Sequence, residues 1–269
     1  MKLGGKKRLV SFGCSFTSGH EIVDHELLNI SFEECNSLKK KIGSISKFDE
    51  YLEKTTGKCI RSLSDISSKR AYAAKLSEKL NLEYKTYAWH GHALEHSVLL
   101  FLQALHKGEL NPATDLLFFG LTTPQRYLHF GPDGRDLTRV IHSPFNNIDY
   151  FYNSYKIMQT YGFCLQQILA TCKEAKFDFI LQPVVPVKFM KYNQEEHNYY
   201  ADMIGCWEFM PLFDKILNES LEYSIDADTH LHDFIDHDIH KTCQYLHPCE
   251  GVHDLFAEHL YGKINIQKN

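Results

Sequence analysis

The sequence predicts an α/β protein of three layers, in which a doubly wound parallel sheet of about five strands lies between two layers of helices. Two observations predict this class. Short apolar runs alternate along the chain with longer segments whose apolar residues recur at helical spacing. The run from Leu116 to Gly120 is apolar without alternation, as expected for a strand that is buried on both faces. Alternation of this kind along one chain is typical of a parallel sheet covered by helices.

The individual elements follow in order from the same patterns. Strands are predicted over 8–12, 82–88, 115–120 and from 177 onward, and helices over 70–80, 94–106, 149–175 and 250–264. The stretch FGPDGRD at 130–136 carries a Pro-Asp-Gly turn signal, which predicts a small hairpin. The polar, charge-rich segment at about 20–68 predicts an insertion or lid with one or two short helices, the alternative being a solvated surface excursion. No linker or repeat marks a second domain, so we expect one domain over 1–269.

The bulk composition limits the classes of function. The chain has 269 residues, 43% of them hydrophobic, so it can bury a substantial core. A net charge of −5 argues against a nucleic-acid-binding surface. No run of apolar residues is long enough for a transmembrane helix, and the N-terminal residues lack a secretory signal pattern. Eight cysteines without a CxxC pair indicate reduced thiols. We therefore expect a cytoplasmic protein without nucleic-acid or membrane partners; the pattern predicts no oligomeric state.

The stretch FGCSFTSG at 12–19 contains the first candidate for chemistry. Ser15 follows the first predicted strand, and Gly91 and Gly120 follow or end two others. Because the carboxyl ends of parallel strands meet at one edge of the sheet, these residues should lie close together. A serine hydroxyl attacks an acyl carbon when a base such as histidine takes its proton, and backbone N–H groups can hold the oxyanion. The alternative is a serine that only caps a turn.

Four blocks of the sequence resemble, in order, those of the SGNH or GDSL-type hydrolases. FGCSFTSG is similar to the first block, with Cys14 in the place of the aspartate, and is most similar to a divergent phage and bacterial subgroup with the wording GCSFT. The stretches TYAWHGHALEHS, DLLFFGLTTPQRY and LHPCEGVHDLFAEHL resemble the second, third and last blocks. The resemblance implies a flavodoxin-like α/β/α fold and a serine esterase or deacylase that forms an acyl-enzyme without a cofactor.

Site residues follow from the resemblance, block by block. It implies that Ser15 is the nucleophile, that His247 is the base, and that the N–H groups of Ser15 and Gly91 hold the oxyanion. Thr122 stands near the place of the family's asparagine, a side-chain oxyanion donor. Arg126, after the third strand, is a candidate for binding an anionic substrate group, with a surface salt bridge as the alternative. His253 is a second candidate for substrate binding.

The chain departs from the family pattern at the residue that should orient the base. The family's aspartate lies three residues before the histidine, where this chain has Gln244. In a serine protease, loss of the corresponding carboxylate lowers turnover about 10⁴-fold. Asp233, Asp236 and Asp238 are candidates to replace it, as is a backbone carbonyl.

Three alternatives to the esterase stay open at the level of sequence. The first is a catalytically degenerate binding or accessory protein of the same fold, encoded by a phage. The second is an acyltransferase of the same fold. The third is a zinc protein, since zinc accepts the side chains of Cys243, His247, Cys249 and His253, although their spacing lacks paired CxxC ligands. The expected substrate is a small-molecule or glycan ester, and no metal is expected.

Overall fold

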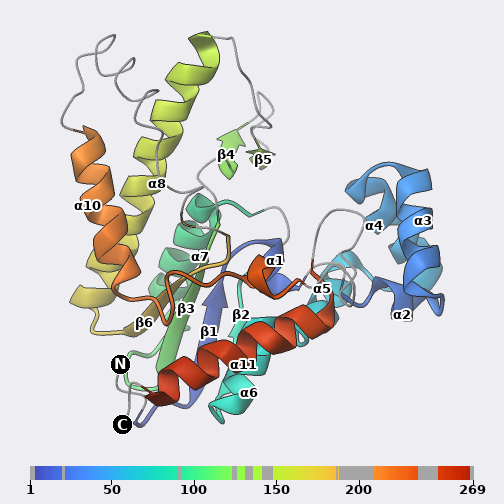
Figure 1. Cartoon of the computed structure of the whole chain (residues 1–269), viewed down its shortest axis with the longest axis horizontal. Coiled ribbons are helices and arrows are strands. Elements are labelled where there is room, and N and C mark those ends of the chain that lie inside the picture. Colours follow the sequence, from blue (N-terminus) through green and yellow to red (C-terminus); the bar gives the residue numbers. More distant parts are fainter. Residues whose placement is uncertain are drawn as a thin grey trace.

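A four-stranded parallel sheet forms the centre of the protein (Figure 1). The computed structural model describes residues 4–19, 22–89, 92–122, 126–130, 136–140, 148–185, 187, 209–235 and 248–266. The sheet order is β2-β1-β3-β6, with β1 at Arg8–Phe12, β2 at Glu83–Thr86, β3 at Asp115–Leu121 and β6 at Asp178–Pro183. The α/β class and the parallel sheet are confirmed, and the strand predicted over 8–12 is confirmed residue for residue.

Neighbouring side chains of β3 show how helices cover both faces of the sheet. The Phe118 ring contacts Tyr72 of α6 (Tyr72–Lys79), with 5.7 Å between ring centroids. The next residue, Phe119, contacts Phe101 of α7 (Leu94–His106) at 5.4 Å. Because successive side chains of a strand point to opposite faces, α6 and α7 lie on opposite sides of the sheet. All seven residues of β3 are buried, which explains its unbroken apolar run.

The remaining long helices complete these two layers. Helix α11 (Glu250–Ile266) packs along α6, and α8 (Ile148–Glu174) packs against α7 (Figure 1). Helix α10 (Phe209–Leu221) packs against α8 and β6. The predicted hairpin is present as the antiparallel strands β4 (Arg126–Phe130) and β5 (Asp136–Val140).

The outer edge of β6 is covered by irregular chain. The backbone N–H of Leu181 donates to the Tyr223 carbonyl at 3.2 Å. The Gln182 side chain donates to the Asp226 carbonyl at 2.7 Å and accepts from the Ile225 N–H at 3.2 Å. The Gln182 side chain therefore makes hydrogen bonds to the neighbouring chain that the backbone would make with another strand. The described sheet has four strands.

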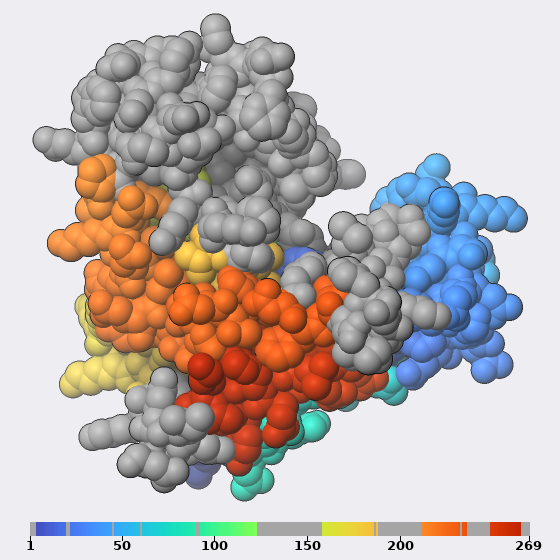
Figure 2. Space-filling model, viewed as in Figure 1, coloured from blue at the N-terminus to red at the C-terminus, as the bar shows by residue number. Residues whose placement is uncertain are grey.

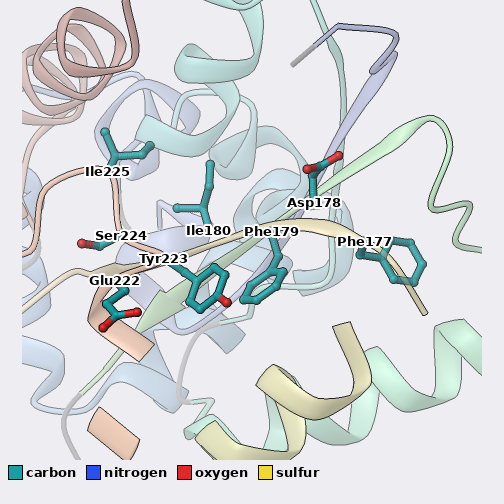
Figure 3. Close-up of a pocket in the computed structure, with 8 residues that line it drawn as sticks. All are labelled: Phe177, Asp178, Phe179, Ile180, Glu222, Tyr223, Ser224 and Ile225. Atoms are coloured by element: carbon teal, nitrogen blue, oxygen red, sulfur yellow. The ribbon is translucent and has the colours of Figure 1, made fainter. Parts of the chain in front are cut away.

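A cavity of about 310 Å³ lies where this covering ends (Figure 3). It is lined by two stretches: 177–180, which comprises the residue before β6 and the first three residues of β6, and 222–225 after α10. In its lining, the Phe179 and Tyr223 rings stack directly on each other, with 4.4 Å between centroids. The cavity lies at the side of the sheet, along the first residues of β6.

The segment predicted as an insertion is more helical than the sequence indicates. It contains four helices, where one or two were predicted: α2 at Asp24–Leu28, α3 at Phe32–Ile42, α4 at Ile45–Thr56 and α5 at Ile60–Ser68. Helix α3 begins with a capping box, in which Ser31 accepts from the Glu34 N–H and Glu34 accepts from the Ser31 N–H. Figure 2 shows the blue atoms of α2 to α4 gathered at one side of the molecule.

This insertion has a small core of its own. Its buried apolar side chains are Cys35, Phe48, Leu52 and Leu63. Beside them, the Lys39 ammonium is 1% exposed and pairs with Asp24 at 2.7 Å, 5.0 Å from the centre of the Phe48 ring. A charged lysine is buried because its carboxylate partner is buried with it. The charges that made this segment look solvated therefore partly stabilise its interior.

Within the described ranges, no helix combines the length and the apolar character needed to cross a bilayer. Six of the eight cysteines fall in these ranges, and all six are free thiols.

We predict that the Asp226 carboxylate stabilises the fold at neutral and mildly acidic pH, and that this stabilisation is lost in strong acid. Burial alone raises the pKa of Asp226, but hydrogen bonds from His259, Lys263 and Thr229 outweigh it and lower the pKa from 3.8 to about 2. A carboxyl whose pKa falls on folding stabilises the protein above its unfolded pKa, and this contribution disappears as the pH falls through the folded value. The Tm of Asp226→Asn should therefore lie below wild type at pH 5, and the difference should vanish towards pH 2.

Thermal unfolding at a series of pH values measures this effect. Asp228→Asn is the control, because the Asp228 side chain is exposed and its backbone N–H, which donates to Asp226, is unchanged. A constant difference in Tm between Asp226→Asn and wild type from pH 5 to pH 2 would contradict the prediction.

Candidate active site

Ser15 lies in a tight turn at the carboxyl end of β1. The strand ends at Phe12, Cys14 has extended backbone angles, and Ser15 begins the short helix α1 (Ser15–Ser18). The N–H groups of Thr17 and Ser18 both donate to the Cys14 carbonyl at 3.0 Å, which closes the turn. Ser15 is 3% exposed. The turn therefore holds this hydroxyl-bearing residue at the edge of the sheet where α/β proteins bind ligands.

Thr17 fixes this turn against the sheet. A Cβ atom added at Gly13 would lie 2.3 Å from Thr17 Oγ1, and one added at Gly120 would lie 2.0 Å from the same atom. Gly120 lies inside β3, which runs one residue beyond the predicted end. Because Gly120 has no side chain, the Thr17 side chain can pack directly against this part of β3.

We predict that Gly120→Ala destabilises the protein by about 1–3 kcal/mol, because the added methyl group overlaps Thr17 and overpacks a buried site. Thermal or urea unfolding measures the loss. Gly262→Ala is the control, since a Cβ at this helical position meets no atom within 4 Å and alanine favours helix. Equal stability of the two variants would contradict this account of the packing.

Tyr72 joins the Ser15 turn to the helix that follows His247. Its hydroxyl hydrogen-bonds with Thr17 Oγ1 at 3.2 Å, and its backbone N–H donates to His253 Nδ1 at 3.1 Å. The Tyr72 and His253 rings also stack, with centroids 5.8 Å apart. Burial raises the pKa of Tyr72 well above its ordinary value, so the hydroxyl stays neutral. His253 is 1% exposed, so its Nδ1 has a structural contact inside the fold.

Ion pairs fix the start of α11. Glu250, three residues after His247, pairs with Arg70 at 3.2 Å and with Lys75 at 2.9 Å. Arg70 also pairs with Glu26 of the insertion helix α2 at 2.7 Å, and this bond raises the pKa of Arg70. Pro248, directly after His247, is buried. The chain that leaves His247 is thus held to both α6 and the insertion.

Several predicted site residues lie outside the described residues. These are Gly91, Asp238, Gln244 and His247. Arg126 begins β4, and only its backbone is described. Of the four side chains considered for zinc, those of Cys249 and His253 are described; across the described ranges no three His, Cys, Asp or Glu side chains cluster as metal ligands would.

Thr122 lies directly after β3 and is 2% exposed. Its carbonyl accepts a hydrogen bond from the Tyr161 hydroxyl at 2.7 Å. Its own hydroxyl is buried and has no hydrogen-bond partner among the described residues. An unsatisfied buried hydroxyl costs about 1–3 kcal/mol. Thr122 follows β3 at the same edge of the sheet as Ser15, and the described residues leave its hydroxyl unsatisfied.

Sequence reasoning missed a histidine–aspartate pair beyond the end of β6. His230 Nδ1 lies 2.8 Å from Asp233 Oδ2, and His230 Nε2 accepts from the Val187 N–H at 3.0 Å. Because Nε2 accepts, the ring proton is on Nδ1 and is donated to Asp233. Asp233, one of the candidates to orient His247, thus holds His230, at the start of the 3₁₀ helix Leu231–Phe234. The His-x-x-Asp spacing was the signal in the sequence.

Comparisons with known proteins give structural neighbours only. No model of a known protein family matches the chain, and no curated protein matches it. A G-D-S-L family protein from Desulfitobacterium hafniense is similar at 10% identity and a TM-score of 0.44, over 96% of this chain and 98% of that chain. A catalytic variant of an acetylxylan esterase from Geobacillus stearothermophilus is similar at 12% identity and a TM-score of 0.47, over 98% and 96%.

A lipase/acylhydrolase from Enterococcus faecalis is also similar, at 12% identity and a TM-score of 0.38, over 97% of this chain and 96% of that chain. The descriptions of these neighbours name a G-D-S-L family protein, an acetylxylan esterase and a lipase/acylhydrolase. At such identities and TM-scores the likeness carries no argument about activity, which has to come from the residues of the site.

Proposed function

We propose that this chain is a serine esterase or deacylase of the SGNH type, with Ser15 as nucleophile and His247 as base. One observation carries the proposal. Tyr72 contacts Thr17, two residues after Ser15, and also His253, six residues after His247. The two segments that the sequence blocks assign to nucleophile and base are therefore fixed to the same buried side chain.

The proposed reaction proceeds through an acyl-enzyme. His247 takes the proton of the Ser15 hydroxyl as Ser15 Oγ bonds to the carbonyl carbon of the ester. The tetrahedral intermediate collapses, the bond to the alcohol oxygen breaks, and the alcohol leaves with the proton from His247. Water then attacks the acyl-enzyme with His247 again as base, which releases the acid and regenerates Ser15. No cofactor takes part in these steps.

Three donors are proposed for the oxyanion of the intermediate. They are the N–H groups of Ser15 and Gly91 and the hydroxyl of Thr122. Thr122 supports this role because its buried hydroxyl has no partner among the described residues. A donor fixed in advance in a buried site typically contributes about 3–4 kcal/mol to transition-state stabilisation.

Two features of the site are proposed from the sequence blocks. Asp238 or Gln244 is proposed to orient His247; Gln244 is neutral, so it would hold the ring without offsetting the charge of the imidazolium. Arg126 is proposed to bind an anionic group of the substrate, which we take to be a small-molecule or glycan ester. The scattered free cysteines support a reducing, cytoplasmic location.

Labelling with a fluorophosphonate tests the proposal, because this reagent bonds to activated serine hydroxyls. Wild type and Ser18→Ala should be labelled, and Ser15→Ala should not. Ser18 is a matched control, since it lies in the same short helix and is buried to a similar degree. Absence of labelling, together with no hydrolysis of short p-nitrophenyl esters, would contradict the proposal and favour a degenerate binding protein. Transfer of the acyl group to an added alcohol would identify an acyltransferase.

A further inference from the structure

A groove of about 470 Å³ lies between the insertion and the end of β2. One wall belongs to α5, and the other to the chain that runs from the end of β2 into α7. The lining residues on α5 are Arg61, Ser64, Asp65 and Ser68, and those opposite are Thr86, Tyr87, Ala88, Trp89, His92 and Leu100. Its volume is in the range of small-molecule sites.

The groove adjoins the Ser15 turn without including Ser15. The Trp89 N–H donates to the Gly13 carbonyl at 3.2 Å, two residues before Ser15. On the other side, α5 packs against α1, the helix that Ser15 begins. Both walls of the groove are therefore attached to the turn that carries the proposed nucleophile. The groove is therefore the described hollow next to this turn on the side of the insertion.

The α5 wall presents polar groups that are available for binding. The side chains of Arg61, Ser64 and Asp65 make no hydrogen bond or ion pair with any described residue, and Arg61 and Asp65 are exposed. Residues three and four apart share one face of a helix, so these groups point to the same side. They offer guanidinium donors, a hydroxyl that both donates and accepts, and a carboxylate acceptor.

The opposite wall is aromatic and held in place. The Tyr87 ring stacks on Phe12 of the core, with 5.1 Å between centroids, and its hydroxyl donates to Glu109. Trp89 and Leu100 continue this apolar surface and are half-buried. The free hydrogen-bonding groups therefore lie across the groove from a largely apolar wall, which also contains Thr86 and His92.

We propose that this groove binds a neutral polyhydroxylated ring, such as a pyranose, in the alcohol part of the ester. Such a ring has an apolar face for Trp89 and hydroxyl groups at its edge for Arg61, Ser64 and Asp65. An aliphatic chain would take water from these three side chains and replace none of its hydrogen bonds, which costs free energy. The claim that this ring belongs to an ester substrate rests on the proposed function. The claim that the groove binds such a ring rests on the groove alone.

Binding is tested in Ser15→Ala, so that no turnover intervenes. The chain has two tryptophans, and the additional replacement Trp207→Phe leaves Trp89 as the reporter of fluorescence. Methyl β-D-glucopyranoside should change this fluorescence saturably, and octanoate should not. Arg61→Ala and Asp65→Ala should each weaken binding about five- to tenfold, the loss of one or two hydrogen bonds. Lys58→Ala is the control, because it removes an exposed charge of the insertion outside the groove.

A kinetic comparison separates failure of the groove from failure of the proposed function. Asp65→Ala should lower kcat/KM for an acetylated methyl glucopyranoside about five- to tenfold relative to kcat/KM for p-nitrophenyl acetate, whose alcohol part has no sugar hydroxyls, and Lys58→Ala should not change this ratio. If sugar binding follows the predicted pattern while no ester is hydrolysed, the proposal that the groove binds a sugar is supported and the proposed esterase function is contradicted. If esters are hydrolysed while sugar binding is absent, equal in all variants or weaker than octanoate binding, the proposal for the groove is overturned.

Discussion

Ser15→Ala is expected to lower kcat for ester hydrolysis about 10⁴-fold or more, because no other group would take over the covalent step. The hydroxyl lies at the start of α1, and its removal changes none of the contacts that Thr17 and Tyr72 make. The fold should therefore persist. Steady-state hydrolysis of p-nitrophenyl acetate measures the loss, and thermal unfolding verifies that the variant is folded.

The neighbouring serine gives the matched comparison for this loss. Ser18 Oγ donates to the Ser15 carbonyl at 3.3 Å, so Ser18→Ala disturbs the same turn without removing the nucleophile. We expect Ser18→Ala to change kcat by less than about tenfold, the value of one hydrogen bond. Similar activity of Ser15→Ala and Ser18→Ala would contradict the role of Ser15.

His247→Ala is expected to lower kcat about 10²–10⁴-fold, the contribution of a positioned general base. In wild type, kcat/KM should rise with pH as His247 loses its proton, because only the neutral imidazole accepts the proton of Ser15. This pH-dependent rise should be absent in His247→Ala. Hydrolysis rates across a pH series measure both effects.

Added imidazole distinguishes a lost base from a disturbed fold. A free imidazole can act as the base when the side chain is missing, so it should restore part of the activity of His247→Ala. It should not restore the activity of Ser15→Ala, where the nucleophile is missing. Unchanged activity and an unchanged pH profile in His247→Ala would contradict its role as base.

Strong local patterns made the core elements predictable. Helix α7 lies at Leu94–His106 as predicted, because its apolar spacing and its position between two strands agree. Strand β3 was predicted to within one residue, since a run buried on both faces has no competing pattern. The order of strands and helices along the chain was sufficient to predict the α/β class.

Long-range contacts decided the features that the sequence did not reveal. The helices of the insertion were under-predicted because the segment is polar and charge-rich, whereas two of its charges, Lys39 and Asp24, form a buried pair. The described sheet has four strands where about five were predicted, and the Gln182 side chain bonds to the irregular chain that covers the edge of β6. The packing role of Gly120 depends on Thr17, which is distant in sequence, and no local pattern reports such a contact.

The same distinction between local patterns and long-range contacts applies to the candidate site. The Ser15 turn was predictable, because a strand followed by Gly13 and a serine is a local signal. The link through Tyr72 was not, since it joins three segments that are far apart in the chain. The same holds for the groove beside α5, whose two walls come from the insertion and from the end of β2.

Trapping the acyl-enzyme tests directly whether Ser15 is the nucleophile. Wild-type protein is mixed with p-nitrophenyl acetate, quenched in acid within the first turnovers, and analysed by mass spectrometry. Wild-type protein should gain one acetyl group, peptide sequencing should place this group on Ser15, and Ser15→Ala should not gain it. Acetylation at another residue, or hydrolysis at full rate by Ser15→Ala, would contradict the role of Ser15 as nucleophile.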